Sequence, residues 1–529
     1  MHTPLLLCTE GWTGRIIGLA LGALAVLGHA PFHFWPIALV SLACLFGRLQ
    51  WAAESPRPGR RGFWTAMWWA IGYFAAGTFW VGSAFIERGP EFIPIMPFMV
   101  AGLAALLAVF WGLAGAFVAR AKLSGLLAVL GFTAAFTLAE LARGHIFGGF
   151  PWNLPAYIFE AGSRPSQVAR WIGAYGLSAL VLMVSAALGQ AVFWREKRWP
   201  MGLAVVPILT FYGIGHLRLS GAALEYQPGV NMRIVSVPFK QSDMMEQNSS
   251  IAITNEFIIA SIKPGIKEVT HLVWPEGAVR GFYRPAMDDP ELLGAVGGLL
   301  ANEDSSPPVW LMNSLQYEME GGRQRVYNVS VAVEFDANGV PAVAGANRKR
   351  KLVAFGEHVP FMDWFDDVQF PLISTNLASI SPAKQKRLAD FPGLPRVSPQ
   401  LCYEVAFPGL TPSGEGKPAE FILNQSNDAW FGKSAGPAQH ANIARYRAIE
   451  TGLPIIRAAS NGISGQIDPY GKIHGRVVSE KIQYIDTQLL KPLKFNDKIK
   501  FLDLALLLIS LSTCVITSLV RRRGVGSRL

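Results

Sequence analysis

The sequence has few charged side chains and few cysteines. Asp, Glu, Lys and Arg make up 16% of its 529 residues, against about a quarter in an ordinary soluble protein, while hydrophobic residues make up 51%. This balance indicates that part of the chain faces lipid. The sequence also lacks Cys-x-x-Cys and His-Glu-x-x-His motifs, so we expect neither a metal site nor a bound cofactor.

Long apolar runs account for the excess of hydrophobic residues. A helix needs about 20 residues to cross the hydrocarbon core of a bilayer. The runs of roughly this length are 13–30, 32–49, 63–85, 92–120, 125–143, 171–194, 199–217 and 501–520. We therefore predict eight transmembrane helices, seven before a long polar segment and one after it.

Basic residues predict the orientation of these helices, because Lys and Arg in short loops stay on the cytoplasmic side. They follow the second, fourth, sixth and eighth spans, at Arg48, 57–61, 120–122, 195–198 and 521–523. Both termini are then cytoplasmic, and the segment from about 218 to 500 lies outside. These flanks explain most of the net charge of +10, so the basic composition indicates topology rather than binding to nucleic acid.

Cys402 is the one cysteine of the external segment, because Cys8, Cys44 and Cys514 lie in or beside the membrane spans. It has no disulfide partner there. A lone thiol in an oxidising compartment is a liability unless it is buried or needed. Cys402 is therefore a candidate functional residue, with a buried and inert cysteine as the alternative.

The external segment 229–488 alternates short β-like runs with helical stretches, which is typical of a layered α/β domain. Its candidate strands are 231–237, 271–274, 309–315, 327–335, 398–402, 421–424 and 455–459. Three reactive side chains lie where such segments give way to loops: Glu276, Lys349 and Cys402. They supply a base, a cation for an oxyanion and a nucleophile, which acyl transfer through a thiol requires.

Each of these residues has a plainer explanation when taken alone. Glu276 could be a solvated turn residue, and Lys349 lies in the basic run 348–351, which could be a wet surface. Their occurrence together with Cys402 favours a catalytic role for all three residues. We interpret His440 as a structural or capping residue rather than an acid or base.

The three segments resemble the Glu-Lys-Cys signature of the nitrilase, or carbon–nitrogen hydrolase, superfamily. Trp-Pro-Glu, Lys-x-x-Leu-Val-x-Phe-Gly-Glu and Cys-Tyr-Glu occur in that order. The stretches 355–360 (Phe-Gly-Glu-His-Val-Pro) and 426–432 (Ser-Asn-Asp-Ala-Trp-Phe-Gly) resemble one branch, the apolipoprotein N-acyltransferases. Asn347 and Ala354 stand where the branch usually has tyrosine and proline, but neither position carries a reacting group.

This resemblance implies a role for each matching residue. Glu276 would be the general base, Lys349 the oxyanion stabiliser and Cys402 the nucleophile. The residues expected to support this triad are Glu357 beside the lysine and Tyr403 and Glu404 beside the nucleophile. For these supporting residues, a purely structural role is the alternative.

The resemblance also implies a fold and a location. Residues 1–220 would form a transmembrane domain of about seven helices, 229–488 a periplasmic nitrilase-like catalytic domain built as an αββα sandwich, and 501–520 a C-terminal transmembrane helix. We expect a multi-pass monomer in the bacterial inner membrane, with both termini in the cytoplasm. The apolar stretches 359–365 and 370–373 are interpreted as a lid at the lipid surface, with a buried loop as the alternative.

Membrane spans favour substrates that reside in the bilayer. The resemblance implies a phospholipid acyl donor, phosphatidylethanolamine foremost, and as acceptor the N-terminal amine of a diacylglyceryl-cysteine lipoprotein. The acyl group would pass through a Cys402 thioester with ping-pong kinetics. One alternative is a membrane-anchored amidase that hydrolyses a small carbon–nitrogen substrate with the same triad. Another is a transporter or receptor with a catalytically dead external domain, which the intact triad disfavours.

Overall fold

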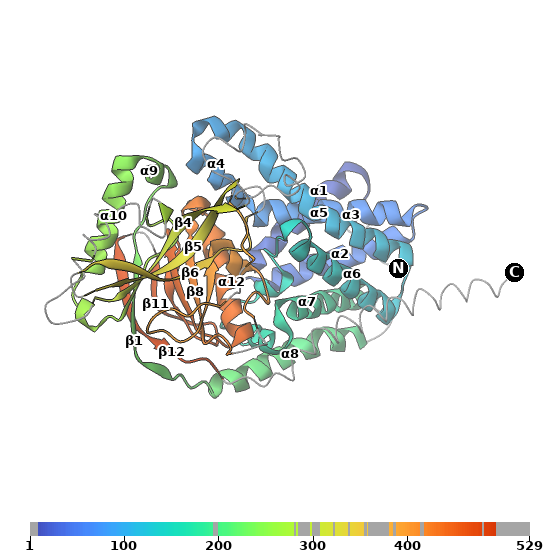
Figure 1. Ribbon diagram of the computed structural model, residues 1–529. Coiled ribbons are helices and arrows are strands. Elements are labelled where there is room, and N and C mark those ends of the chain that lie inside the picture. Colours follow the sequence, from blue (N-terminus) through green and yellow to red (C-terminus); the bar gives the residue numbers. More distant parts are fainter. Residues whose placement is uncertain are drawn as a thin grey trace. The chain divides into compact units, whose positions relative to one another are not determined.

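The computed structural model describes two compact units, one built from residues up to Ala222 and the other mainly from Ala223–Lys494 (Figure 1). We call them the helical unit and the α/β unit. The described residues are 9–193, 199–279, 282–283, 297–298, 307–320, 323–336, 339–353, 357, 380–384, 388–412, 417–478 and 481–493. The expected lid and the expected span 501–520 lie outside these residues.

The helical unit consists of apolar α-helices. They are α1 (Gly11–Ala25), α2 (Trp35–Ala53), α3 (Pro58–Gly77), α4 (Ser83–Arg88), α5 (Met96–Ala121), α6 (Gly125–His145), α7 (Ala169–Phe193) and α8 (Trp199–Ser220). Within the described residues, six helical stretches are long and apolar enough to cross a membrane. A seventh results if Pro58–Gly77 and Phe79–Arg88, which meet at 57°, form one span. The total of eight stays a prediction.

The predicted span 63–85 is not one straight helix in the structure, because the helix breaks at Thr78. The backbone there leaves the helical region (φ −116°, ψ 18°). The Thr78 hydroxyl and its backbone N–H both donate to the carbonyl oxygen of Phe74, at 2.7 and 2.8 Å, and a hydroxyl bond of this kind accompanies helix bends.

Glycines allow close contact between the helices that pack around α3. A Cβ atom built on Gly22 of α1 would lie 1.9 Å from the carbonyl oxygen of Trp69 in α3. One built on Gly62 of α3 would lie 2.3 Å from the carbonyl oxygen of Gly115 in α5. Small residues of this kind let membrane helices approach backbone to backbone.

Two β-sheets form the middle of the α/β unit. The first has strand order β12-β1-β2-β4-β5-β6, with β3 beside β4, and the second has order β11-β10-β9-β8-β7. The strands of the first sheet are β1 (Tyr226–Ser236), β2 (His271–Val273), β3 (Phe282–Tyr283), β4 (Val309–Glu320), β5 (Arg323–Phe335), β6 (Pro341–Arg348) and β12 (Gln483–Leu490). Those of the second are β7 (Val397–Leu401), β8 (Phe421–Asn427), β9 (Ile455–Ser460), β10 (Ile463–Ile467) and β11 (Ile473–Val478).

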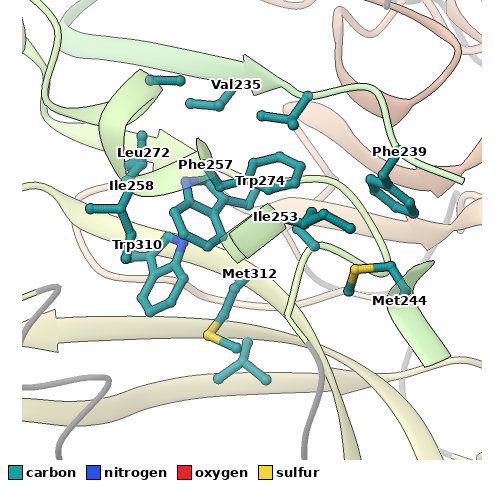
Figure 2. Packing of buried hydrophobic residues seen from close by; sticks show 14 of the residues in the cluster. Val235, Phe239, Met244, Ile253, Phe257, Ile258, Leu272, Trp274, Trp310 and Met312 are labelled. Carbon is teal, nitrogen blue, oxygen red and sulfur yellow. The ribbon is translucent and has the colours of Figure 1, made fainter. Parts of the chain in front are cut away.

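Alternating side chains divide the core of this unit into three layers. Met232, Leu311 and Leu423 belong to the cluster between the two sheets. On the other face of the first sheet, Trp274 and Trp310 pack with α10 (Gln247–Ser261), their rings meeting edge to face at 4.6 Å (Figure 2). A third cluster joins the outer face of the second sheet to α12 (Gly436–Thr451). The order helix, sheet, sheet, helix is the αββα sandwich expected.

Candidate active site

The ends of three strands carry the expected reactive residues. Glu276 follows β2, Lys349 follows β6 and Cys402 follows β7. Strand β2 is parallel to β4, and β4, β5 and β6 are successively antiparallel, so β2 and β6 run in the same direction. Their carboxyl ends therefore lie at one edge of the first sheet, where the loops of α/β folds form sites.

The Glu276 carboxylate is buried and held in a fixed orientation. Its Oε1 accepts a hydrogen bond from Asn328 Nδ2 of β5 at 2.7 Å, and its Oε2 accepts one from the backbone N–H of Asn427 at 3.1 Å. Lys349 Nζ lies 3.4 Å from Oε1. Neighbours on three sides thus prevent the carboxylate from turning away from the lysine.

Lys349 lies between two carboxylates. Its side chain is 1% exposed, and its Nζ donates to Glu357 Oε1 at 2.8 Å. Glu357 is itself fixed, because its Oε2 accepts from the backbone N–H of Val353 at 2.9 Å. Burial alone would lower the pKa of Lys349, but the charges of Glu276 and Glu357 outweigh it and place the pKa above its usual range. The side chain is a permanent cation at neutral pH.

Cys402 has an unusual backbone conformation for a non-glycine residue, with φ at +47°. Strain of this kind persists only where the surroundings enforce it, often at functional sites. Burial, followed by the charge of Glu276, raises the pKa of the Cys402 thiol well above its usual range, although Lys349 and the Ser426 hydroxyl act in the opposite direction. The resting side chain is a thiol, so it needs a base to become a nucleophile.

The turn Cys402–Ala406, which we call the nucleophile turn, follows β7. Glu404 links it to the loop that follows Lys349. Its Oε2 accepts from the backbone N–H of Leu401 at 2.8 Å, while its Oε1 accepts from those of Arg350 and Lys351 at 2.8 and 3.2 Å. Burial raises the pKa of Glu404, although these backbone hydrogen bonds act to lower it. The residue holds together two loops that come from different sheets.

The two other residues expected to support the triad, Glu357 and Tyr403, make different contacts. Glu357 contacts the lysine directly, whereas the ring of Tyr403 packs edge to face against Phe407, with centroids 5.1 Å apart. The structure therefore brings Glu276, Lys349 and Cys402 together with Glu357 and Glu404.

A buried cluster beside Cys402 was only partly anticipated from the sequence. His440 Nδ1 lies 2.8 Å from Asp428 Oδ1, and His440 Nε2 lies 3.2 Å from the carbonyl oxygen of Cys402. Arg457 Nη2 donates to Asp428 Oδ2 at 2.7 Å. The structural interpretation of His440 matches these contacts, and burial, with Arg457, lowers its pKa although Asp428 raises it. The ring thus supports the nucleophile turn by contacts at both of its nitrogens.

Sequence analysis missed several polar contacts of the site. The signal that could have revealed them is a polar residue within an otherwise apolar strand. Asn328 stands between Tyr327 and Val329 in an apolar strand, and its side chain binds Glu276. Asn427 and Asp428 belong to the stretch 426–432, but the sequence alone assigns them no partner.

Replacing His440 by alanine should loosen the nucleophile turn. The variant leaves the partly buried carbonyl of Cys402 without this contact, and an unsatisfied acceptor costs up to about 1–3 kcal/mol when it is buried. We expect a lower melting temperature and slower modification of Cys402 by substrate, whereas His474→Ala, which removes a contact with Asp468 instead, should leave the rate of modification unchanged. Equal rates for His440→Ala and the parent protein would show that the contact does not support the turn.

Comparison with known proteins decides the family. Residues 21–187 match the apolipoprotein N-acyltransferase N-terminal domain, and residues 265–488 match carbon-nitrogen hydrolase. The apolipoprotein N-acyltransferase of Caulobacter vibrioides is 36% identical over 471 residues, covering 87% of this chain and 86% of that protein. The chain belongs to the apolipoprotein N-acyltransferase family. A second family member, from Rhodopseudomonas palustris, is 30% identical over 481 residues, covering 88% and 87%.

Solved structures similar to this acyltransferase family member are carbon–nitrogen hydrolases. A CN-hydrolase superfamily protein from Xanthomonas campestris has a TM-score of 0.34 and 16% identity, covering 49% of this chain and 90% of that one. An amidase from Nesterenkonia has a TM-score of 0.32 and 15% identity, covering 51% and 93%. The match of residues 265–488 gives the α/β unit the carbon–nitrogen hydrolase fold, and the apolar helices make the chain a membrane protein.

Proposed function

We propose that this enzyme moves an acyl chain from a phospholipid, phosphatidylethanolamine foremost, to the N-terminal amine of diacylglyceryl-cysteine lipoproteins through a thioester on Cys402. The observation that carries the proposal is a half-buried thiol that lies within electrostatic reach of a fixed carboxylate and a permanent ammonium group. The names of the relatives support the choice of substrates.

In the first half-reaction, Glu276 takes the proton of the Cys402 thiol, and the thiolate attacks the carbonyl carbon of the phospholipid ester. Lys349 stabilises the negative oxygen of the tetrahedral intermediate. When the carbon–oxygen bond breaks, the leaving lysophospholipid takes the proton from Glu276. The thioester remains on the enzyme.

In the second half-reaction, the lipoprotein amine attacks the thioester carbonyl and gives a proton to Glu276. An α-amine has a reference pKa of about 8, so it must be deprotonated to react. Breaking the carbon–sulfur bond forms the amide, and Glu276 returns the proton to the Cys402 thiolate. One carboxylate therefore acts as base and acid in both steps. Because the lysophospholipid leaves before the amine reacts with the acyl-enzyme, ping-pong kinetics are predicted.

The remaining residues and segments are assigned as follows. Glu357 and Glu404 position Lys349 and the nucleophile turn through their hydrogen bonds, and Tyr403 packs against Phe407. We assign residues 1–220 and 501–520 to eight membrane spans and 229–488 to a catalytic domain on the periplasmic side of the inner membrane. The basic loops after every second span support this orientation, and we propose a monomer with no bound cofactor.

The intermediate can be trapped and weighed. The full-length enzyme should gain the mass of one acyl chain after incubation with phosphatidylethanolamine, and hydroxylamine should remove it. Cys402→Ala should gain nothing, while Cys44→Ala, which changes the other free cysteine of the described residues, should behave like the parent.

The acceptor distinguishes the transferase from the alternative amidase. Adding a diacylated lipopeptide should discharge the adduct and produce an N-acylated peptide of matching mass. An adduct that only water removes would favour a membrane-anchored carbon–nitrogen hydrolase, and the absence of an adduct on active enzyme would contradict the thioester.

A further inference from the structure

One pocket of the helical unit is lined by an unusual number of arginines. It has a volume of about 500 Å³ and lies where α1 begins, α2 ends and α3 begins. The arginines that line it are Arg15, Arg48, Arg57, Arg60 and Arg61. Glu10 is the one carboxylate among the lining residues, so they carry a formal excess of four positive charges. The volume is that of a small-molecule site, about 300–1,000 Å³.

Two of the five arginines of this arginine pocket are held in place. Arg48 is 5% exposed, and its guanidinium group donates to the carbonyl oxygen of Gly14 at 2.9 Å and to Thr9 Oγ1 at 3.2 Å. Arg61 is bound to Glu10 at 2.5 Å, so the single carboxylate offsets one arginine. Charges fixed in this way attract an anion without first having to be ordered, and the exposed arginines of the pocket add to the attraction.

Tryptophan rings form the apolar part of the lining. The Arg61 guanidinium lies 3.5 Å from the centre of the Trp51 ring, and that of Arg15 lies 5.6 Å from the centre of the Trp68 ring. Trp64 is 47% exposed beside them. Tryptophan and arginine at the ends of membrane-spanning helices lie at the level of the lipid headgroups. The pocket thus matches a ligand with a phosphate group and an apolar remainder.

We propose that the arginine pocket binds the phosphodiester headgroup of an anionic phospholipid, at a site separate from Cys402. Guanidinium groups bind phosphate oxygens in pairs, and basic pockets between membrane helices hold lipid headgroups. A zwitterionic headgroup gains less, because its own ammonium group is repelled by the excess positive charge. Topology alone explains basic residues near span ends, but it does not require them to gather around one pocket. The inference is independent of the acyl-transfer mechanism.

Lipid binding to the delipidated full-length enzyme in detergent tests this inference. Phosphatidylglycerol should bind about tenfold more tightly than phosphatidylethanolamine and should raise the melting temperature, because a ligand of the folded state stabilises it. Inorganic phosphate at millimolar concentration should not displace it. Equal binding of the two lipids would overturn the proposal, and displacement by phosphate would assign the pocket to a soluble anion instead.

Matched substitutions distinguish lipid binding in this pocket from a general electrostatic attraction of the lipid to the basic protein. Arg57 and Arg60 are exposed, so the variant Arg57→Gln/Arg60→Gln should fold and should lose about tenfold or more in affinity for phosphatidylglycerol. Arg120→Gln/Lys122→Gln removes the same charge near the end of α5, close to α3 but outside the pocket, and should change affinity less than about twofold. Similar losses in both variants would show that only the net charge matters.

Discussion

The variant Glu276→Gln is expected to slow acyl transfer by about 10²–10⁴-fold, the usual contribution of a general base. Gln keeps the size of the side chain, and its single carbonyl oxygen can still accept from Asn328 or from the backbone N–H of Asn427 but not from both, so the site should stay folded at a modest cost in stability. The control Glu268→Gln, at an exposed position of the same unit, should transfer acyl chains at the parental rate. A loss smaller than about tenfold would exclude Glu276 as the base.

The same variant should make the Cys402 thiol more reactive toward an alkylating reagent, although it slows acyl transfer. The charge of Glu276 is one cause, after burial, of the raised pKa of Cys402. Without that charge, the pKa falls and more thiolate is present at any pH below it. Alkylation of Cys402 by iodoacetamide should therefore become faster in Glu276→Gln at pH 8, while acyl transfer becomes slower. Mass spectrometry of the labelled peptide measures this rate, and a slower alkylation would contradict the electrostatic account.

Lys349→Met should damage both the chemistry and the fold. The loss of an oxyanion stabiliser costs about 10²–10³ in rate. The substitution also leaves Glu276 and Glu357 facing each other without the intervening cation, and removing one partner of a buried ion pair costs about 3–5 kcal/mol. We expect a markedly lower melting temperature together with loss of the acyl adduct.

A second substitution tests the origin of this instability. Lys349→Met/Glu357→Gln removes one of the two facing carboxylates, so it should recover part of the melting temperature but none of the activity. Lys351→Met is the matched control, since the Lys351 ammonium lies 5.1 Å over the Phe407 ring and contacts neither carboxylate in the described structure. If Lys351→Met abolished the adduct and Lys349→Met did not, the two lysines would have to exchange roles.

Sequence patterns located the strands whose side chains are apolar and buried. The runs 421–424 and 455–459 became β8 and β9, in which every residue is buried. Strand β6 was not predicted, because Pro341–Arg348 is rich in alanine and glycine and has no alternation of apolar and polar residues. In the structure, the burial of its side chains does not alternate either. Strand β12 was also missed; its pairing with β1 joins residues 247 to 264 positions apart, which no local pattern reports.

The reactive groups were easier to predict than their supports. Glu276, Lys349 and Cys402 each end a strand in a recognisable motif, and the structure brings them together. The link made by Glu404 could not be foreseen, because it joins loops of two different sheets whose packing only the folded chain defines. The break at Thr78 was hidden for a related reason, since threonine is compatible with both a helix and its interruption.

The assembly of the site across two sheets has a consequence for the tolerance of the core to substitution. Glu276 and Lys349 belong to one sheet and Cys402 to the other, and buried hydrogen bonds of Gln425 to Ser330 and to the carbonyl oxygen of Trp274 fasten the two. The separation of the sheets is therefore also the separation of the base from the nucleophile. Small changes of side-chain volume in the layer that holds Leu311 and Leu423 should displace the base from the nucleophile, and so slow catalysis, before they unfold the protein. Selection for catalysis would therefore preserve the packing between the sheets.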